Sequence, residues 1–205
     1  MIAIVDYGMG NIRSLRNALE YLGEDVTITD VPAEFDAADR IVLPGVGAFG
    51  DAMLAIRERG LEDALTYQAM TVRKPILGIC LGMQLFARSS SEHGEHRGLS
   101  WIDADIRRLD VQRPLKVPHV GWNDVQFPAE DWLFEGIRPD EANFYFVHSF
   151  HMVCHTLSDR LATIDHAGTV TAVVRSGNLV ATQFHPEKSQ DNGLKLLGNW
   201  AHWNP

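Results

Sequence analysis

Short apolar runs alternate with segments of helical period over the first eighty residues. The apolar runs predict buried strands, and the two segments between them repeat their hydrophobic positions every three or four residues. The expected strands are 2–5, 25–29, 40–45 and 74–79, and the expected helices are 11–23 and 48–60. Strands that alternate with helices in this way predict a parallel sheet.

The segment 11–23 shows the clearest helical pattern. Its apolar positions fall on one face, with a polar residue before it and a glycine after it that are typical of a helix start and stop. The apolar residues are Ile12, Leu15, Leu19 and Leu22, and the flanking residues are Asn11 and Gly23.

The texture changes after about Leu99 to strand-like stretches interrupted by proline and glycine. They cover 104–111, 119–127, 143–153 and 171–184. We expect antiparallel additions at one edge of the sheet, a polar loop over 88–98 and a closing helix from Asn192 to Trp203.

The predicted fold is α/β: a mainly parallel central sheet flanked by helices on both faces, with antiparallel additions, in a flavodoxin-like three-layer sandwich. No linker or repeat divides the chain. We therefore expect a single domain over 1–205.

Composition and charge narrow the classes of function. Eighteen basic and 27 acidic residues give a net charge of −9, which opposes affinity for nucleic acid and for anionic membranes. The amino-terminal segment has no signal-peptide pattern, and no apolar run is long enough to cross a bilayer. Two cysteines, Cys80 and Cys154, are a poor disulfide framework for this length. We expect a cytoplasmic protein.

Cys80 lies in GICLG, between Gly78 and Gly82, after an apolar strand and before a helix. This is the pattern of a nucleophile elbow, with cysteine in the place of serine. Glycines two residues away on either side allow the strained turn to pack against its neighbours. The partial positive charge at a helix N-terminus stabilises a thiolate, so a cysteine at this position is reactive, and Cys80 is the candidate nucleophile.

A cysteine nucleophile needs a base, and QFHPEKS supplies one in His185. Glu187 lies two residues further on, and the two side chains would point the same way in an extended chain. Glu187 would then orient the imidazole.

Acyl transfer also needs donors for an oxyanion. The backbone N–H of Leu81, directly after the nucleophile, is one candidate. Gly45 and Gly47 follow an apolar strand and allow backbone N–H groups to turn toward a ligand.

Six stretches together resemble a known family. LPGVGAFGDAM, GICLGMQLF and QFHPEKS are similar to the class I glutamine amidotransferases. DYGMGNIRSL, VPHVGWN and FYFVHSF are similar, within that family, to the glutaminase subunits of imidazole glycerol phosphate synthase. The glutaminases of guanine, anthranilate, carbamoyl phosphate and pyridoxal phosphate synthesis share the Cys-His-Glu triad, so they stay open as alternatives.

The resemblance implies a reaction and a substrate site. Cys80 would attack the side-chain amide of glutamine, and His185 would protonate the departing ammonia, with Glu187 as the third triad member. The oxyanion hole would comprise Leu81 with Val46 and Gly47. Glutamine itself would be held by Gly45, Gly47, Gln84, Glu92, Ser149 and Phe150. No cofactor and no metal is expected.

The resemblance also implies a partner. A (β/α)8-barrel cyclase subunit would receive the ammonia in a heterodimer and make imidazole glycerol phosphate and aminoimidazole carboxamide ribonucleotide in histidine biosynthesis. The loop from Gly45 to Gly47 would complete the oxyanion hole only when the partner is liganded. The positions at the contact are Asn11, Trp122, Tyr145 and Lys188.

Three rival interpretations were weighed. DYGMGN with Asp30 imitates a dinucleotide fingerprint, but Arg13 stands in place of the third glycine. HSFHMVCH suggests zinc, but alternation along one strand would point His148 and Cys154 away from His151. A stand-alone cysteine hydrolase with the same elbow also fits the triad.

Overall fold

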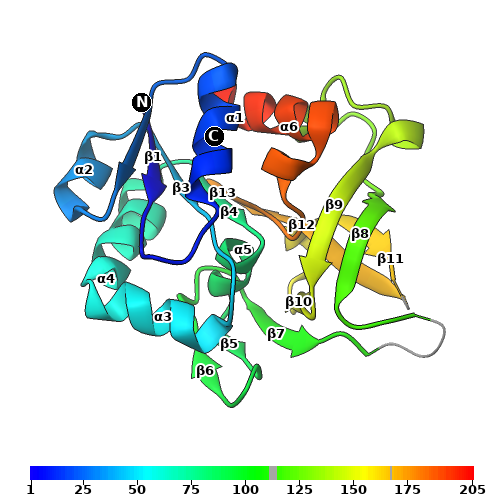
Figure 1. Cartoon of the computed structure of the whole chain (residues 1–205), viewed down its shortest axis with the longest axis horizontal. Coiled ribbons are helices and arrows are strands. Elements are labelled where there is room, and N and C mark those ends of the chain that lie inside the picture. Colours follow the sequence, from blue (N-terminus) through cyan, green and yellow to red (C-terminus); the bar gives the residue numbers. More distant parts are fainter. Residues whose placement is uncertain (111–114, 167) are drawn as a thin grey trace.

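A seven-stranded mixed sheet forms the centre of the molecule in the computed structural model (Figure 1), which describes residues 1–110, 115–166 and 168–205. Five strands are parallel, in the order β13-β4-β3-β1-β2. β12 and β11 continue the sheet antiparallel beyond β13. The strands are β1 (Ile2–Val5), β2 (Val26–Thr29), β3 (Arg40–Leu43), β4 (Ile76–Ile79), β11 (Arg160–Asp165), β12 (Thr169–Ser176) and β13 (Leu179–Thr182).

Helices cover both faces of this sheet. α1 and α6 pack on one face, and α2 to α5 on the other (Figure 1). Their bounds are α1 (Ile12–Tyr21), α2 (Pro32–Ala37), α3 (Phe49–Glu58), α4 (Leu61–Thr66), α5 (Leu81–Leu85) and α6 (Gln190–His202), with a π-helical turn at Tyr67–Val72 after α4. The predicted three-layer arrangement is confirmed.

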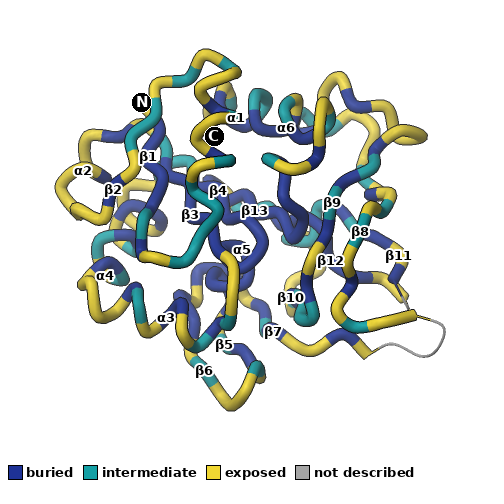
Figure 2. Tube along the Cα trace, viewed as in Figure 1, coloured by how far each residue is buried: buried dark blue, intermediate teal, exposed yellow. Residues whose placement is uncertain are grey.

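Residues alternate along β1 between two hydrophobic cores. Ile2 and Ile4 face the core under α1 and α6, whereas Ala3 and Val5 face the core under α3. The central strands are drawn dark blue, as buried, in Figure 2. A strand that is buried on both faces has apolar residues at every position, and this is why the apolar run 2–5 predicted β1.

The expected antiparallel addition at one edge is present as β12 and β11, but the remaining strands form two small sheets of their own. β8 (His119–Asp124) pairs with β9 (Asn143–His148), and the second small sheet has the order β10-β7-β5-β6. Its strands are β5 (Ser89–Ser90), β6 (His96–Arg97), β7 (Ala104–Arg108) and β10 (Phe150–Cys154). Val111, the last residue of the predicted strand 104–111, lies outside the described residues.

Two predicted segments differ from the structure. The expected loop 88–98 contains the β5–β6 pair, because each of these strands needs only two residues to join a sheet. The expected strand 143–153 is broken at Ser149, where the chain leaves β9 and enters the other small sheet as β10. The one-strand alternation that we used for the histidines therefore does not apply across Ser149.

Four 3₁₀ turns complete the connections: η2 (Trp132–Phe134), η3 (Pro139–Glu141), η4 (Leu157–Asp159) and η5 (Pro186–Lys188). Within 1–110, 115–166 and 168–205, none of the helices combines the length and the apolar character that a bilayer crossing requires. The same residues contain no group of three or more His, Cys, Asp or Glu side chains placed to hold a metal ion.

Candidate active site

Cys80 occupies a strained turn between β4 and α5. Its backbone has φ 55° and ψ −107°, a conformation that is rare for a residue with a side chain. A Cβ added at Gly82 would overlap the backbone carbonyl oxygen of Leu43, and one at Gly78 would lie 2.9 Å from Cζ of Phe86. Glycine at both positions is therefore required for the turn to pack.

The Cys80 sulfur lies just inside the surface, with 6% of the residue exposed. The Sγ atom is 3.9 Å from the carbonyl oxygen of Val147, to which a thiol would donate, and 3.8 Å from the Gln183 amide nitrogen, which would donate to it. Gln183 is fully buried beside the nucleophile. Gln183 was not among the predicted site residues, although it stands two residues before His185 in QFHPEKS.

His185 and Glu187 form a buried pair. The imidazole Nδ1 is 2.8 Å from Oε1 of Glu187, and the two side chains are 2% and 3% exposed. The chain here is not extended as we expected, because Pro186 to Lys188 form a 3₁₀ turn that carries the carboxylate back to the imidazole. The backbone N–H of His185 also donates to the carbonyl oxygen of Tyr145 on β9, at 3.0 Å.

The pKa of His185 is raised from 6.5 to about 9. Burial alone would lower this pKa, but hydrogen bonding and charge at Cys80 and Glu187 outweigh burial. The other ring nitrogen, Nε2, is buried and has no hydrogen-bond partner of good geometry among the described residues. At neutral pH the imidazole therefore keeps a second proton, and its Nε2 is the atom available to Cys80.

A cavity of about 330 Å³ brings residues from six parts of the chain together. It is lined by Val46, Gly47, Cys80, Leu81, Gln84, Glu92, Pro118, Val147, His148, Ser149, Phe150 and His185. Most of the predicted substrate and oxyanion residues are among them. Gly45 and Glu187 do not line this cavity; with Asn11 they border a smaller space beside His185.

The predicted oxyanion donor is occupied in this structure. The backbone N–H of Leu81 donates to the carbonyl oxygen of Gly45, at 3.4 Å. Gly47 has φ +107°, and Val46 is 39% exposed. A substrate oxyanion would have to replace the Gly45 carbonyl at this N–H, so the loop from Gly45 to Gly47 must shift before the donor is free.

Tyr7 anchors the same loop. Its hydroxyl donates to the carbonyl oxygen of Pro44 at 2.8 Å, inside the core. Burial, with the nearby Cys80 charge, raises the pKa of Tyr7, so the phenol stays protonated as a donor. This contact could not be predicted from the sequence, because a tyrosine that follows a strand can occupy many positions in a core.

The two polar residues predicted to hold glutamine also bond to the protein. Oε2 of Glu92 accepts a hydrogen bond from the backbone N–H of Phe49, the first residue of α3, at 2.8 Å. The Gln84 amide nitrogen donates to the carbonyl oxygen of Phe150 at 3.0 Å and to Oε1 of Gln183 at 3.1 Å. Both side chains are therefore fixed in the cavity wall.

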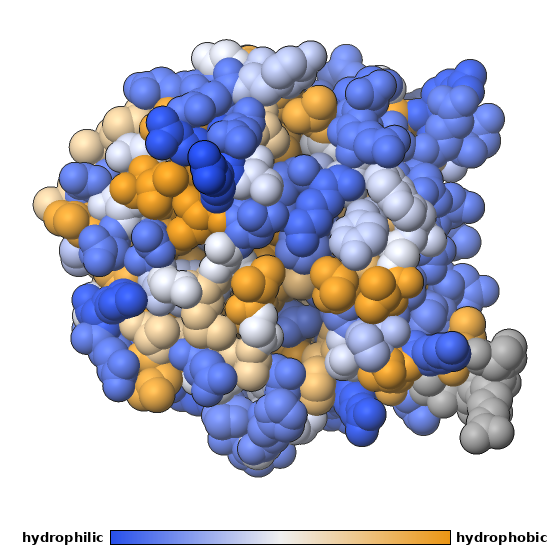
Figure 3. All heavy atoms as spheres, in the orientation of Figure 1, coloured by the Kyte–Doolittle hydropathy of each residue, from blue (hydrophilic) through white to orange (hydrophobic). Residues whose placement is uncertain are grey.

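Three of the four predicted contact residues lie together. The rings of Trp122 and Tyr145 meet edge to face at 6.0 Å, and Nζ of Lys188 lies 5.9 Å from the centre of the Tyr145 ring. Val120 and Val147 are exposed on the same two strands, and Figure 3 shows hydrophobic side chains gathered over β8 and β9. We call Val120, Trp122, Tyr145 and Val147 the β8–β9 face. The fourth predicted residue, Asn11, lies apart from it, beside His185 and Glu187.

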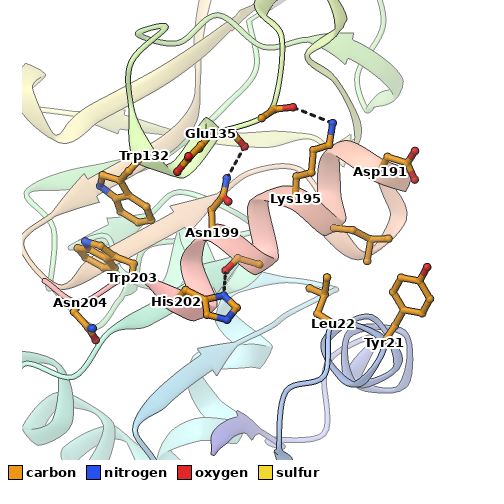
Figure 4. A pocket seen from close by; sticks show the side chains of 13 residues that line it. Tyr21, Leu22, Trp132, Glu135, Asp191, Lys195, Asn199, His202, Trp203 and Asn204 are labelled. Atoms are coloured by element: carbon orange, nitrogen blue, oxygen red, sulfur yellow. Dashed lines mark hydrogen bonds between the residues drawn. The ribbon is translucent and has the colours of Figure 1, made fainter.

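A larger cavity, of about 950 Å³, lies against α6 and the end of α1. Figure 4 shows Trp132 and Trp203 stacked at one side of it, with ring centres 4.6 Å apart, and Lys195 donating to the carbonyl oxygen of Gly136. Asn199 donates to the carbonyl oxygen of Glu135. Its lining residues include no cysteine, and these amide and ammonium groups already bond to the protein, so the smaller cavity is the better candidate.

Comparisons with known proteins agree with this geometry. The family profile described as "Glutamine amidotransferase class-I" matches residues 3–202. The imidazole glycerol phosphate synthase subunit HisH 2 of Nitrobacter winogradskyi is 46% identical, covering 100% of this chain and 99% of that protein. The subunit HisH of Sulfurimonas denitrificans is 47% identical, covering 99% and 98%.

A solved structure of a glutamine amidotransferase supports the fold. It superposes with a TM-score of 0.72 at 22% identity and covers 98% of this chain and 100% of that chain. The predicted fold class is thereby confirmed. On the family profile and the relatives together, the chain belongs to the class I glutamine amidotransferases, within the family of imidazole glycerol phosphate synthase subunits named HisH.

Proposed function

We propose that this chain is the glutaminase subunit of imidazole glycerol phosphate synthase, with Cys80, His185 and Glu187 as its catalytic residues. The observation that supports it is the placement of Cys80 at a strained elbow, in one cavity with a His185 that is buried against Glu187. The two relatives named above are subunits of imidazole glycerol phosphate synthase by name, and this chain matches nearly their whole length.

The first half of the reaction forms a thioester. The thiol proton of Cys80 is the one held at Nε2 of His185, so Sγ attacks the side-chain carbonyl carbon of glutamine as the thiolate and forms a C–S bond. The carbonyl oxygen becomes an oxyanion, which accepts a hydrogen bond from the N–H of Leu81 once that N–H is released from Gly45. The C–N bond then breaks, and the proton held at Nε2 of His185 goes to the departing ammonia. The raised pKa of His185 supports this role because it keeps that proton in place at neutral pH.

The second half hydrolyses the thioester. A water gives one proton to Nε2 of His185 and attacks the same carbon. The C–S bond breaks, glutamate leaves and Cys80 is restored. Oε1 of Glu187 accepts from Nδ1–H of the imidazole at 2.8 Å and holds the ring so that Nε2 faces the sulfur.

Recognition of glutamine rests on the opposite wall of the cavity. The carboxylate of Glu92 is the group there that suits the α-ammonium, and one of its oxygens remains after the bond to Phe49. Gln84, Ser149 and Phe150 would border the α-carboxylate. Gly47 and Val46 close the side near the oxyanion.

The partner subunit would dock on the β8–β9 face. Trp122 is 45% exposed and Val120 56% exposed, and the neighbouring Lys188 adds a positive charge. Exposed aromatic and apolar side chains of this kind are typical of interface anchors. We propose a (β/α)8-barrel cyclase as the occupant, which receives the ammonia, and the cytoplasm as the site of assembly.

Glutamine turnover by the purified chain tests this function. We expect glutamate release that rises when the cyclase and its nucleotide ligand are added, and none above background from Cys80→Ala under either condition. Cleavage of peptides or other amides without any effect of the cyclase would instead indicate a stand-alone cysteine hydrolase. Stimulation by a different synthase partner would assign the chain to another amidotransferase.

A further inference from the structure

Two buried histidines lie directly opposite each other on β8 and β9. His119 and His148 are register partners, and each is 6% exposed. Nδ1 of His119 is 3.0 Å from Nε2 of His148. Their side chains point inward, on the side of the ribbon opposite to the β8–β9 face, because side chains alternate along a strand. The catalytic steps above use neither residue.

The pair continues at both ends through further hydrogen bonds. Nδ1 of His148 is 2.9 Å from the carbonyl oxygen of Phe150, in the cavity wall. Nε2 of His119 is 3.5 Å from the amide nitrogen of Asn123, which also donates to the backbone of Asp165. One chain of contacts therefore runs from the substrate cavity to the partly exposed Asn123.

This chain of contacts has one consistent assignment of protons. A carbonyl oxygen only accepts, so Nδ1 of His148 carries a proton and donates to Phe150. If the ring is neutral, its Nε2 accepts, and the proton in the His119–His148 bond then sits on Nδ1 of His119. Nε2 of His119 is left as an acceptor for the Asn123 amide. All three links donate in the same direction, toward Phe150.

The surroundings favour the neutral form of both rings. Burial lowers the pKa of His148 to about 3 and that of His119 to about 4. His166, which stacks on His119 with ring centres 4.0 Å apart, is a smaller cause of the lowered pKa of both rings, and His151 is another for His148. A proton added to Nε2 of His148 would point two N–H donors at each other, unless the proton on His119 moved to its other nitrogen. The directional chain of hydrogen bonds from Asn123 to Phe150, which we call the relay, therefore requires both rings to be neutral.

The last hydrogen bond of this chain, from His148 to Phe150, lies where the backbone passes from one small sheet to the other. β9 ends at His148 and β10 begins at Phe150, so the chain changes sheets at Ser149. The Phe150 carbonyl accepts from both His148 and Gln84. One donor comes from β9 and the other from α5, and together they hold the Ser149–Phe150 backbone at the cavity.

We infer that His119 and His148 are positioning residues: their directional hydrogen bonds fix the Ser149–Phe150 backbone in the geometry that binds glutamine. This inference rests on the proposed function of the cavity. It predicts that loss of the His119 donor weakens glutamine binding while the chemistry at Cys80 is unaffected.

The proton assignment is tested on the wild-type chain by nitrogen NMR of its imidazole rings at pH 7. We expect His119 and His148 to be neutral, each with its proton on Nδ1. A cationic ring, or a proton on Nε2 of either residue, would overturn the relay. Because this measurement needs no activity, it judges the relay even if glutamine is not the substrate.

The effect on glutamine is tested with two variants of His119. His119→Phe keeps a ring for stacking on His166 but removes the donor, whereas the side-chain nitrogen of Asn in His119→Asn stands in for Nδ1. We expect KM for glutamine to rise about tenfold in His119→Phe, and by no more than about threefold in His119→Asn, with kcat within about threefold in both.

Alkylation of Cys80 by iodoacetamide is the control, because it reports the nucleophile without glutamine recognition. Its rate should be unchanged in both variants. If wild-type turnover is intact but KM is unchanged in a folded His119→Phe, or rises equally in both variants, the inference fails while the proposed function stands. Loss of alkylation together with turnover would mean a general structural role and would also overturn it.

Discussion

The two walls of the substrate cavity are built in different ways. The wall that carries Cys80 belongs to the parallel sheet, where glycine packing against the Leu43 backbone leaves the elbow one conformation. The wall that carries Ser149 lies between the two small sheets, where β9 ends and β10 begins, and is held by side-chain hydrogen bonds from His148 and Gln84.

This difference separates chemistry from recognition. Backbone packing around the elbow fixes the position of the nucleophile. The hydrogen-bonded wall lies on the inner side of the ribbon whose outer side is the β8–β9 face. A partner that docks on that face would therefore act on the recognition wall more readily than on the elbow.

The substitution Gly82→Ala would break the first wall. The new Cβ overlaps the Leu43 carbonyl, and no flexible side chain can move to admit it. We expect a loss of about 3 kcal/mol or more in the free energy of unfolding, the upper range for overpacking against backbone. Urea denaturation measures it.

Gly198→Ala is the matched control for that change. Gly198 lies inside α6, and its added Cβ would meet only Leu22, at 3.9 Å. Alanine in a helix interior stabilises by about 0.5–1 kcal/mol relative to glycine. Equal losses in the two variants would contradict the packing account of the elbow.

Glu187→Gln leaves the packing of the Cys80 wall intact and removes only the negative charge beside the imidazole. Gln can still accept from Nδ1–H of His185, but the carboxylate charge that helps raise the pKa of His185 is gone. We expect kcat for glutamine to fall by about a hundredfold, the scale of a misdirected general acid–base. The pH profile of kcat should also show its His185 limb at lower pH; an unmoved limb would place the acid elsewhere.

Trp122→Ala tests the outer side of the ribbon. Removing this exposed ring should weaken binding of the partner subunit by about 1–3 kcal/mol, as for an interface anchor, with glutamine turnover of the isolated chain unchanged. Tyr67→Ala is the control, because Tyr67 is 53% exposed in the turn that precedes β4, at the other end of the strand from Cys80. A titration that finds both variants equal to wild type would remove the β8–β9 face as the docking surface.

Acid should lower the free energy of unfolding through the two histidines behind the Ser149 wall, His119 and His148. The pKa values of His119 and His148 in the folded chain, about 4 and about 3, lie below the ordinary 6.5. The unfolded chain takes up these protons first, so their contribution to stability is complete above pH 6.5 and declines as the pH falls toward 4. We expect wild type to lose about 2 kcal/mol more than His119→Asn between pH 7 and 5 in urea unfolding, because each pH unit below 6.5 changes the contribution of His119 by about 1.4 kcal/mol. Equal losses would mean that these rings do not titrate as a buried pair.

The sequence predicted the first wall better than the second. The Cys80 elbow, α1 and the parallel strands are local patterns, since a strand, a glycine pair and a helix start occur within ten residues. The role of His119 depends on its pairing with His148 across 29 positions. Neither the break at Ser149 nor the Tyr7 contact has a local signature, because each is decided by which sheet the chain joins.

The most direct test of the account is mass spectrometry of the chain after it is mixed with glutamine and quenched in acid. Wild type should carry one γ-glutamyl group on Cys80, and Cys80→Ala none. In His185→Ala the thioester should form more than about a hundredfold more slowly, the usual scale for a positioned base. Glutamine turnover without any adduct on Cys80, or an adduct on another residue, would contradict the account.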